Sequence, residues 1–240
     1  MNLSTIITRI KLKIGLLNIV TPFEDLDSVI HNILKEITIP VFSIYYPAKD
    51  TIVLNTTELE LLEKQSDYEK YLLPDFKTRK LITVLDVSYD TSHLAGLGYY
   101  SGGMPIMQGN LLNQLMLGNA GAQVMNQVIP KLTFHFEGPR TVYIFNAYAS
   151  TKLKFELGFM HDSTLASIPE TCSEEFLKLA LLDVKENLYP TMKHFSELNT
   201  VHGTINLKLD EWANAESERK ELIDKWDDNY HLDLKPMYYI

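Results

Sequence analysis

A histidine and an aspartate stand side by side at His161 and Asp162, directly after an apolar alternating run, and His202 follows in the last third of the chain. An imidazole beside a carboxylate can serve in general acid–base catalysis or in metal binding. Two interpretations stay open for these residues. One is an enzyme whose site is assembled from scattered residues around His161, Asp162 and His202, and the other is a polar turn that follows a strand.

The other catalytic signatures fail on spacing. The chain has no phosphate-binding loop, no strand-linked dinucleotide fingerprint and no pair of histidines at i and i+4 with a glutamate between them. Ser101 is not centred between glycines as a nucleophile elbow requires, and Cys172, the one cysteine, has no histidine beside it in sequence. We therefore expect no cofactor and no metal site, and a non-enzymatic role is favoured.

The most unusual feature is a segment without ionic side chains. Residues 91–130 contain no Asp, Glu, Lys or Arg, although 22% of the chain is charged, and they hold seven of the 11 glycines. A membrane segment is disfavoured because the many amides would lack partners in lipid. Two interpretations remain: a long internal loop with a buried helix of the same domain, or a surface covered by other protein chains, since interface cores are depleted of charge.

We favour the second interpretation and expect residues 91–130 to form an arm that contacts other subunits. Amides and hydroxyls can bond across an interface without the desolvation penalty of a full charge. The residues predicted to lie in this subunit interface are Tyr99, Tyr100, Gly102, Gly103, Met104, Met107, Leu111, Leu115, Met116 and Met125.

Acidic residues crowd the C-terminal region, where nine of them lie between Asp210 and Asp233 against three basic residues. The simplest interpretation is a solvated helix face. The alternative is a surface that stands close to DNA without holding it, because like charge repels phosphate. The residues that would face such a DNA channel are Glu216, Glu218, Asp224, Asp227 and Asp228.

Composition narrows the class of protein. The chain has 240 residues, 45% of them hydrophobic, and a formal net charge of −9. These values are ordinary for a globular protein, and the negative charge argues against sequence-specific binding to nucleic acid. Basic residues interrupt the apolar stretch near the start, so no signal peptide is predicted, and no uncharged run is apolar enough to span a membrane.

Helices are predicted at both ends of the chain. Apolar residues recur at helical spacing over 3–17, and a second helix is expected to begin at Thr21-Pro22 and to stop at Ile39-Pro40. The remaining predicted helices begin at Thr57, which would run to Pro74, at Thr171 with Glu174 as a capping box, and near Asp210.

Strands are predicted in the middle of the chain, where polar and apolar residues alternate over 131–137 and 152–159 and where 80–89 is rich in β-branched residues. The short connections between the last three of the central strands indicate an antiparallel meander over 131–159. The predicted strands are 51–54, 80–89, 131–137, 141–148, 152–159 and a short one over 204–209. The expected fold is thus a single α+β domain over 1–240, with helices at both ends around a small antiparallel sheet and the arm 91–130 protruding.

Two stretches of the chain carry a family resemblance. The run Ser163–Pro169 ahead of the helix over 173–189, and the stretch 203–216, are similar to the neck proteins of tailed bacteriophages, which are also called head-completion or portal-adaptor proteins. This resemblance covers about residues 130–235 best. It implies a ring, commonly dodecameric, between the portal and the tail, and it brings no catalytic residues.

On these grounds the expected function is that of a structural virion protein in the phage neck, made in the host cytoplasm. Its expected partners are further copies of itself, the portal protein and other neck or tail proteins, with no membrane. A tail or baseplate component is the alternative within the same class, and the scattered-site enzyme is the alternative outside it.

Overall fold

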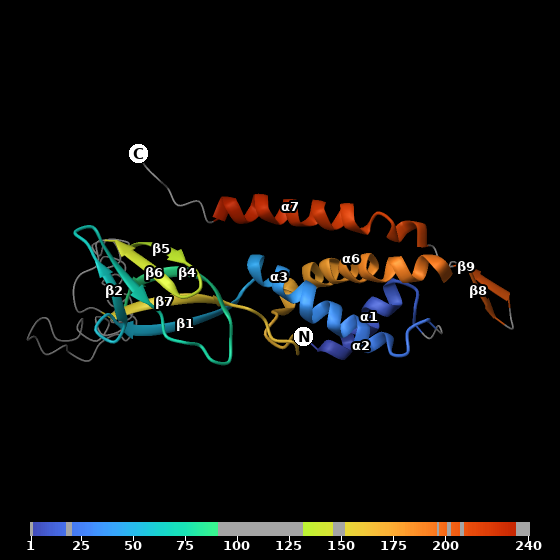
Figure 1. Cartoon of the computed structure of the whole chain (residues 1–240), viewed down its shortest axis with the longest axis horizontal. Helices are drawn as coiled ribbons and strands as arrows, with labels where there is room; N and C mark the ends of the chain where they lie inside the picture. Colours follow the sequence, from blue (N-terminus) through green and yellow to red (C-terminus); the bar gives the residue numbers. More distant parts are fainter. Residues whose placement is uncertain are drawn as a thin grey trace, which may run out of the picture. The chain divides into compact units, whose positions relative to one another are not determined.

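The computed structural model describes residues 2–17, 21–90, 132–145, 152–195, 197–200, 203–206 and 209–233. The chain divides into two compact units (Figure 1). The helical unit joins Met1–Ala48 to Phe159–Ile240, and the sheet unit is the stretch between them, Lys49–Gly158. The α+β class is confirmed, whereas the single domain over 1–240 stays a prediction.

The helical unit begins with two capped helices. Helix α1 (Leu3–Lys13) has Asn2 as its N-cap, whose side-chain oxygen accepts from the backbone N–H of Ser4 at 3.1 Å. Helix α2 (Leu26–Ile33) is capped by Asp25, which accepts from two backbone N–H groups of the first turn. The predicted start at Thr21-Pro22 is therefore wrong, because a carboxylate four residues further on satisfies the orphan donors.

The sequence predicts that the second helix stops at Ile39-Pro40, but the helical run continues through Pro40. After α2 comes a π-helical turn, η1 (Leu34–Thr38), and then helix α3 (Ile39–Tyr45). The N–H of Ile39 bonds to the carbonyl of Leu34, five residues back, and Pro40 falls in the first turn of α3, where the missing N–H costs nothing. Residues 41–45 are helical for this reason.

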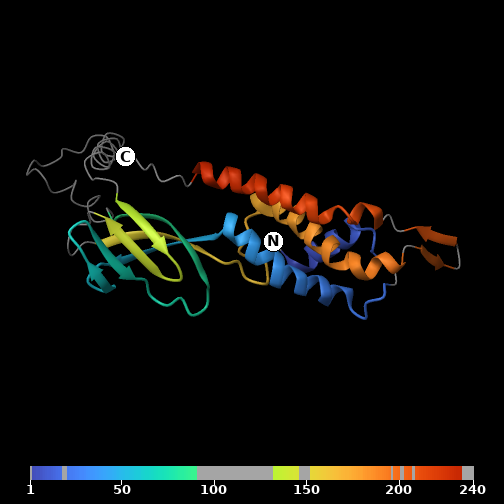
Figure 2. The same cartoon turned by 45° about the horizontal axis from the view of Figure 1, so that its top comes forward.

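Two long helices complete the helical unit and lie side by side in both views (Figure 2). Helix α6 (Ser173–Met192) follows a 3-10 turn, η2 (Glu170–Cys172), and gives way to another, η3 (Lys193–Phe195), soon after Pro190. Its N-cap is Cys172, which makes no capping bond, so the predicted capping box at Thr171 is wrong. The hairpin β8 (Glu197–Thr200) with β9 (Gly203–Asn206) and the turn η4 (Leu209–Trp212) lead into α7 (Ala215–Asp233).

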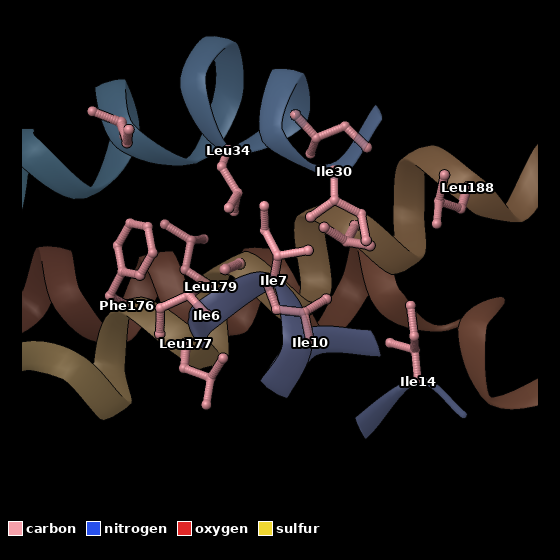
Figure 3. Packing of buried hydrophobic residues seen from close by; sticks show 14 of the residues in the cluster. Ile6, Ile7, Ile10, Ile14, Ile30, Leu34, Phe176, Leu177, Leu179 and Leu188 are labelled. Atoms are coloured by element: carbon pink, nitrogen blue, oxygen red, sulfur yellow. The ribbon is translucent and has the colours of Figure 1, made fainter. Parts of the chain in front are cut away.

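One apolar core holds the helical unit together. Figure 3 shows side chains from α1, α2 and α6 meeting in it, among them Ile10, Ile30 and Phe176, each fully buried. Each buried aliphatic or aromatic side chain contributes on the order of 1.5–3 kcal/mol relative to an exposed one. The helical periodicity of the sequence predicts most of these positions correctly.

The sheet unit contains two sheets. The order of the first is β1 (Ala48–Asn55), β7 (Lys152–Phe159), β4 (Leu81–Tyr89). The order of the second is β2 (Glu60–Lys64), β3 (Tyr68–Leu72), β6 (Thr141–Phe145), β5 (Thr133–Glu137), and its neighbours are antiparallel.

Two sequence predictions are wrong in the sheet unit. The helix expected from Thr57 is the hairpin of β2 and β3, since pairing of β3 along β6 outweighs a local helical signal. The hairpin of β5 and β6 is confirmed, but the third strand of the predicted meander, β7, lies in the other sheet. Both edges of β6 are already occupied, by β3 and β5, and β7 pairs elsewhere.

Candidate functional site

The predicted interface arm lies outside the described residues. This holds for Tyr99, Tyr100, Gly102, Gly103, Met104, Met107, Leu111, Leu115, Met116 and Met125. The arm's attachment points are described: it leaves the sheet unit after β4 and Asp90 and returns at Leu132, just before β5. Its role as a subunit contact therefore stays a prediction.

His161 is a buried structural side chain. It is 2% exposed, its Nε2 lies 2.7 Å from the carbonyl oxygen of Tyr46, and its Nδ1 lies 2.9 Å from Oγ of Ser167. A carbonyl can only accept, so Nε2 carries the proton and Nδ1 accepts from the Ser167 hydroxyl. Burial lowers the pKa of His161, which keeps the ring neutral.

Asp162 and His202 do not complete an acid–base site with His161. The Asp162 carboxylate turns away into an Asx turn, where Oδ1 accepts from the backbone N–H of Thr164 at 3.0 Å and from its hydroxyl at 2.6 Å. His202 lies outside the described residues. Both nitrogens of His161 are occupied by groups of the same unit, so the described part of the proposed enzyme site offers no reactive atom to a substrate.

The predicted channel residues all belong to α7 and differ in exposure. Glu216, Glu218, Asp224 and Asp228 are exposed, whereas Asp227 is half-buried and accepts from the hydroxyl of Tyr45 at 2.9 Å. The opposite side of the helix carries the buried Ala215 and Trp226. Four of these five residues thus form an exposed acidic surface, the fifth joins α7 to α3, and the channel-facing role stays a prediction.

A buried ionic contact that the sequence did not indicate fixes α7 to the rest of the helical unit. Asp183 of α6 is fully buried; its Oδ1 accepts from Nε of Arg219 at 2.5 Å and its Oδ2 accepts from the hydroxyl of Thr38 at 2.7 Å. Three elements, η1, α6 and α7, therefore converge on one carboxylate. The acidic surface of α7 is held in a defined orientation as a result.

An aromatic cluster lies on one face of the four-stranded sheet, and the sequence did not predict it. The rings of Tyr68 and Tyr143 lie 5.5 Å apart, those of Tyr68 and Phe145 5.9 Å, and those of His135 and Tyr143 5.8 Å. We call these four residues the aromatic face. Strands β5 and β6 are expected from the sequence, but Tyr68 comes from a stretch predicted to be helical.

Metal binding finds no support in the described part of the chain, where no three His, Cys, Asp or Glu side chains come together as ligands.

Cys172 is a half-exposed free thiol, with its Sγ 3.8 Å from the hydroxyl of Thr171. No helix among the described residues has the length and apolar character needed to cross a bilayer.

The features found among the described residues are surfaces and structural contacts, and the comparison with known families adds the family. A family model described as bacteriophage ring protein matches residues 1–238. The chain belongs to the bacteriophage ring protein family. No curated protein matches this ring protein.

Family membership confirms the coarser part of the sequence prediction. Membership of a ring protein family implies association with copies of the same chain, and a phage ring structural protein is consistent with a non-enzymatic role. The resemblance to phage neck proteins identified the right kind of protein, a phage structural component. The portal, the tail and the DNA channel go beyond what the family description states.

Proposed function

We propose that this ring protein is a structural virion component of the phage neck, where copies of it form a ring that joins the portal of the head to the tail. The observation that carries the proposal is the family match over nearly the whole chain. The likeness of residues 163–189 and 203–216 to neck proteins favours the neck over the tail or baseplate. By the same likeness the ring is dodecameric, and its neighbours are the portal and other neck or tail proteins.

The uncharged arm supplies the contact between subunits in this proposal. Residues 91–130 carry no Asp, Glu, Lys or Arg, so burying them against another chain does not incur the cost of desolvating those charged side chains. Buried apolar surface stabilises a contact by about 25 cal/mol per Å², less the cost of ordering the chain. Each copy both gives and receives such a contact, which is how heterologous contacts close a ring.

The acidic surface of α7 faces the DNA channel in this proposal. Its exposed carboxylates, on Glu216, Glu218, Asp224 and Asp228, repel the phosphates of a duplex that must pass without sticking. Asp183 and Arg219 anchor this helix on its inner side. The surface therefore combines a fixed backbone with a charge that disfavours DNA binding.

Purified full-length protein provides the first test. Light scattering across a concentration series, with electron microscopy of the same samples, is expected to show closed rings of one size. A cryo-electron microscopy map of the intact particle then tests the position, and density for the chain between portal and tail supports the neck. Density in the tail or baseplate contradicts the neck assignment, and a protein that stays monomeric at every concentration contradicts ring formation.

A deletion separates assembly from folding. Removing residues 96–109 is expected to leave the thermal unfolding transition close to that of the full chain and to abolish ring formation. The midpoint of unfolding by circular dichroism and the mass by light scattering are measured on the same preparation. Global unfolding of the deletion variant would mean that the arm is part of the protein's own core.

A further inference from the structure

The aromatic face extends over both central strands of the four-stranded sheet and onto the edge strand β5. Its strands follow the order β2, β3, β6, β5, so Tyr68 of β3 and Tyr143 and Phe145 of β6 belong to the two central strands. Tyr68 is paired with Phe145 in register, and His135 of β5 is paired with Tyr143. The four rings therefore form one continuous surface across three strands.

Among the described residues of these strands, the buried side chains lie on the opposite face of the sheet. Side chains alternate between the two faces of a strand, and the buried residues Tyr71, Val142 and Ile144 occupy the other face. Tyr68, Tyr143 and Phe145 keep part of their surface accessible, and His135 is exposed. A sheet needs only one buried face for its stability, so three further aromatic rings on the second face call for another explanation.

The carboxylates near the rings lie at their hydroxyl groups, and one charged side chain, that of Lys70, lies over a ring. The hydroxyl of Tyr68 donates to Glu63 at 3.1 Å, and the hydroxyl of Tyr143 donates to Glu137 at 2.7 Å. Lys70 covers the ring of Tyr143, with its Nζ 4.7 Å from the ring centroid. Aromatic rings at the centre with polar groups at the rim are the arrangement of protein–protein interfaces, where Tyr is enriched.

One of the two edge strands of this sheet, β2, is protected against pairing with a foreign strand. All five residues of β2 are exposed, and the strand carries a bulge between Leu61 and Glu63. Bulges and charged side chains such as Glu60 and Lys64 are the usual means by which an edge strand avoids adding a foreign strand.

We infer that the aromatic face receives the uncharged arm, residues 91–130, of a second copy of this chain in the ring; the inference rests on the proposed function. The arm's chemistry fits the face. It carries four methionines, whose sulfur atoms make favourable contacts with aromatic rings, and amides that can bond the rim carboxylates of Glu63 and Glu137. Its glycines let the backbone approach flat rings closely.

Ring geometry favours a second copy over the chain's own arm. The arm is attached between β4 and β5, so every copy carries both the arm and the aromatic face. A closed ring needs two different surfaces on each copy, one to give and one to receive. The arm and the aromatic face are such a pair, and the contact repeats from copy to copy around the ring.

Serine substitutions on the aromatic face test the inference in the full-length chain. Tyr143→Ser and Phe145→Ser are expected to raise the protein concentration at the midpoint of assembly at least about tenfold each, as loss of an interface aromatic does. The matched control is Leu62→Ser, which removes an exposed apolar side chain from β2, outside the face, and is expected to leave the midpoint unchanged. Thermal unfolding of each variant is measured alongside.

Crosslinking tests the occupant without relying on a variant that must fold well. Benzoylphenylalanine replaces Phe145, rings are formed from a mixture of isotope-labelled and unlabelled chains, and crosslinked peptides are read by mass spectrometry. Crosslinks between labelled and unlabelled chains that map to residues 91–130 support the inference. Crosslinks confined to one chain, or to a different region of the neighbour, overturn it.

The two levels of the proposal fail in different ways. Serine variants that assemble like the wild type overturn the aromatic face as the docking surface and leave the ring function standing. A wild-type protein that never leaves the monomeric state contradicts the ring function, and with it the inference.

Discussion

His161 shows how a residue with catalytic chemistry serves structure instead. Its backbone N–H donates to the hydroxyl oxygen of Ser43 at 3.1 Å, and its two ring nitrogens bond to Tyr46 and Ser167. Ser43 is itself buried and donates to the carbonyl of Ile39 at 2.7 Å. The group joins α3 to the turn that follows β7, and every polar atom of the ring has a partner.

His161 is expected to make stability depend on pH. Burial holds its pKa in the folded protein below the ordinary value of about 6.5, so the unfolded chain takes up the proton first as pH falls. The free energy of unfolding is therefore not reduced by protonation of His161 above about pH 6.5, and it decreases as pH falls below that value. Urea unfolding of wild type and His161→Gln between pH 5 and 7.5 measures the slope, which is expected to be flatter in the variant.

The control for this prediction is His194→Gln, which changes an exposed histidine of η3. It is expected to keep the wild-type slope of stability against pH. If His161→Gln also keeps that slope, the titration of His161 is not the cause of the pH dependence.

At the scale of elements, the buried carboxylate of Asp183 makes α7 depend on Arg219. Asp183 is buried in an apolar core. Arg219→Ala leaves the Asp183 carboxylate with one hydrogen bond to a side chain among the described residues, that from the hydroxyl of Thr38. A buried charge that loses its partner costs about 3–5 kcal/mol. Chemical denaturation is expected to show a loss in this range.

A double substitution checks the explanation. Asp183→Leu together with Arg219→Met removes both charges, and it is expected to be more stable than Arg219→Ala alone. If the double variant is as unstable as the sum of two independent losses, the two side chains are not coupled.

Helix α7 is also held by an aromatic contact. Trp226 is buried, and its ring lies 5.2 Å from that of Tyr46, 5.5 Å from that of Tyr45 and 6.0 Å from that of Phe42. Trp226→Ala is expected to cost about 3 kcal/mol and to raise hydrogen exchange in α7 before that in α6. Trp226→Phe is the control and is expected to retain most of the protection. Equal loss of protection in both helices would mean that α7 does not open separately.

At the scale of the whole molecule, the net charge of −9 and the acidic surface of α7 predict that the ring protein does not bind duplex DNA. A variant with Glu216, Glu218, Asp224 and Asp228 all changed to lysine is expected to fold and assemble normally, since these side chains are exposed. It is expected to bind duplex DNA with an affinity that falls steeply with salt, whereas the wild type does not bind.

Electrophoretic mobility at several salt concentrations measures this difference. A variant with lysines at four exposed positions outside α7, Glu58, Glu60, Asp67 and Asp75, is the matched control for charge alone. If both variants in ring form bind DNA equally well, the acidic surface of α7 has no special position toward the duplex.

Much of the fold follows from the sequence alone. Helical spacing of apolar residues predicts α1 and α6, and period-two alternation predicts β5 and β7, because each pattern matches the geometry of one local structure. The lack of ionic residues in 91–130 and the crowding of acids toward the end are also properties of the sequence. They were sufficient to favour a structural protein over an enzyme.

Tertiary structure decided what depends on partners far apart in the chain. The segment from Thr57 became a hairpin because β3 pairs with β6, some 70 residues away, and β7 joined the other sheet because β6 had no free edge. The contact between Asp183 and Arg219 and the contact between the rings of Tyr68 and Tyr143 also join residues far apart in the sequence. Local patterns fix the direction in which a side chain points, but only the packed chain fixes which side chain it meets.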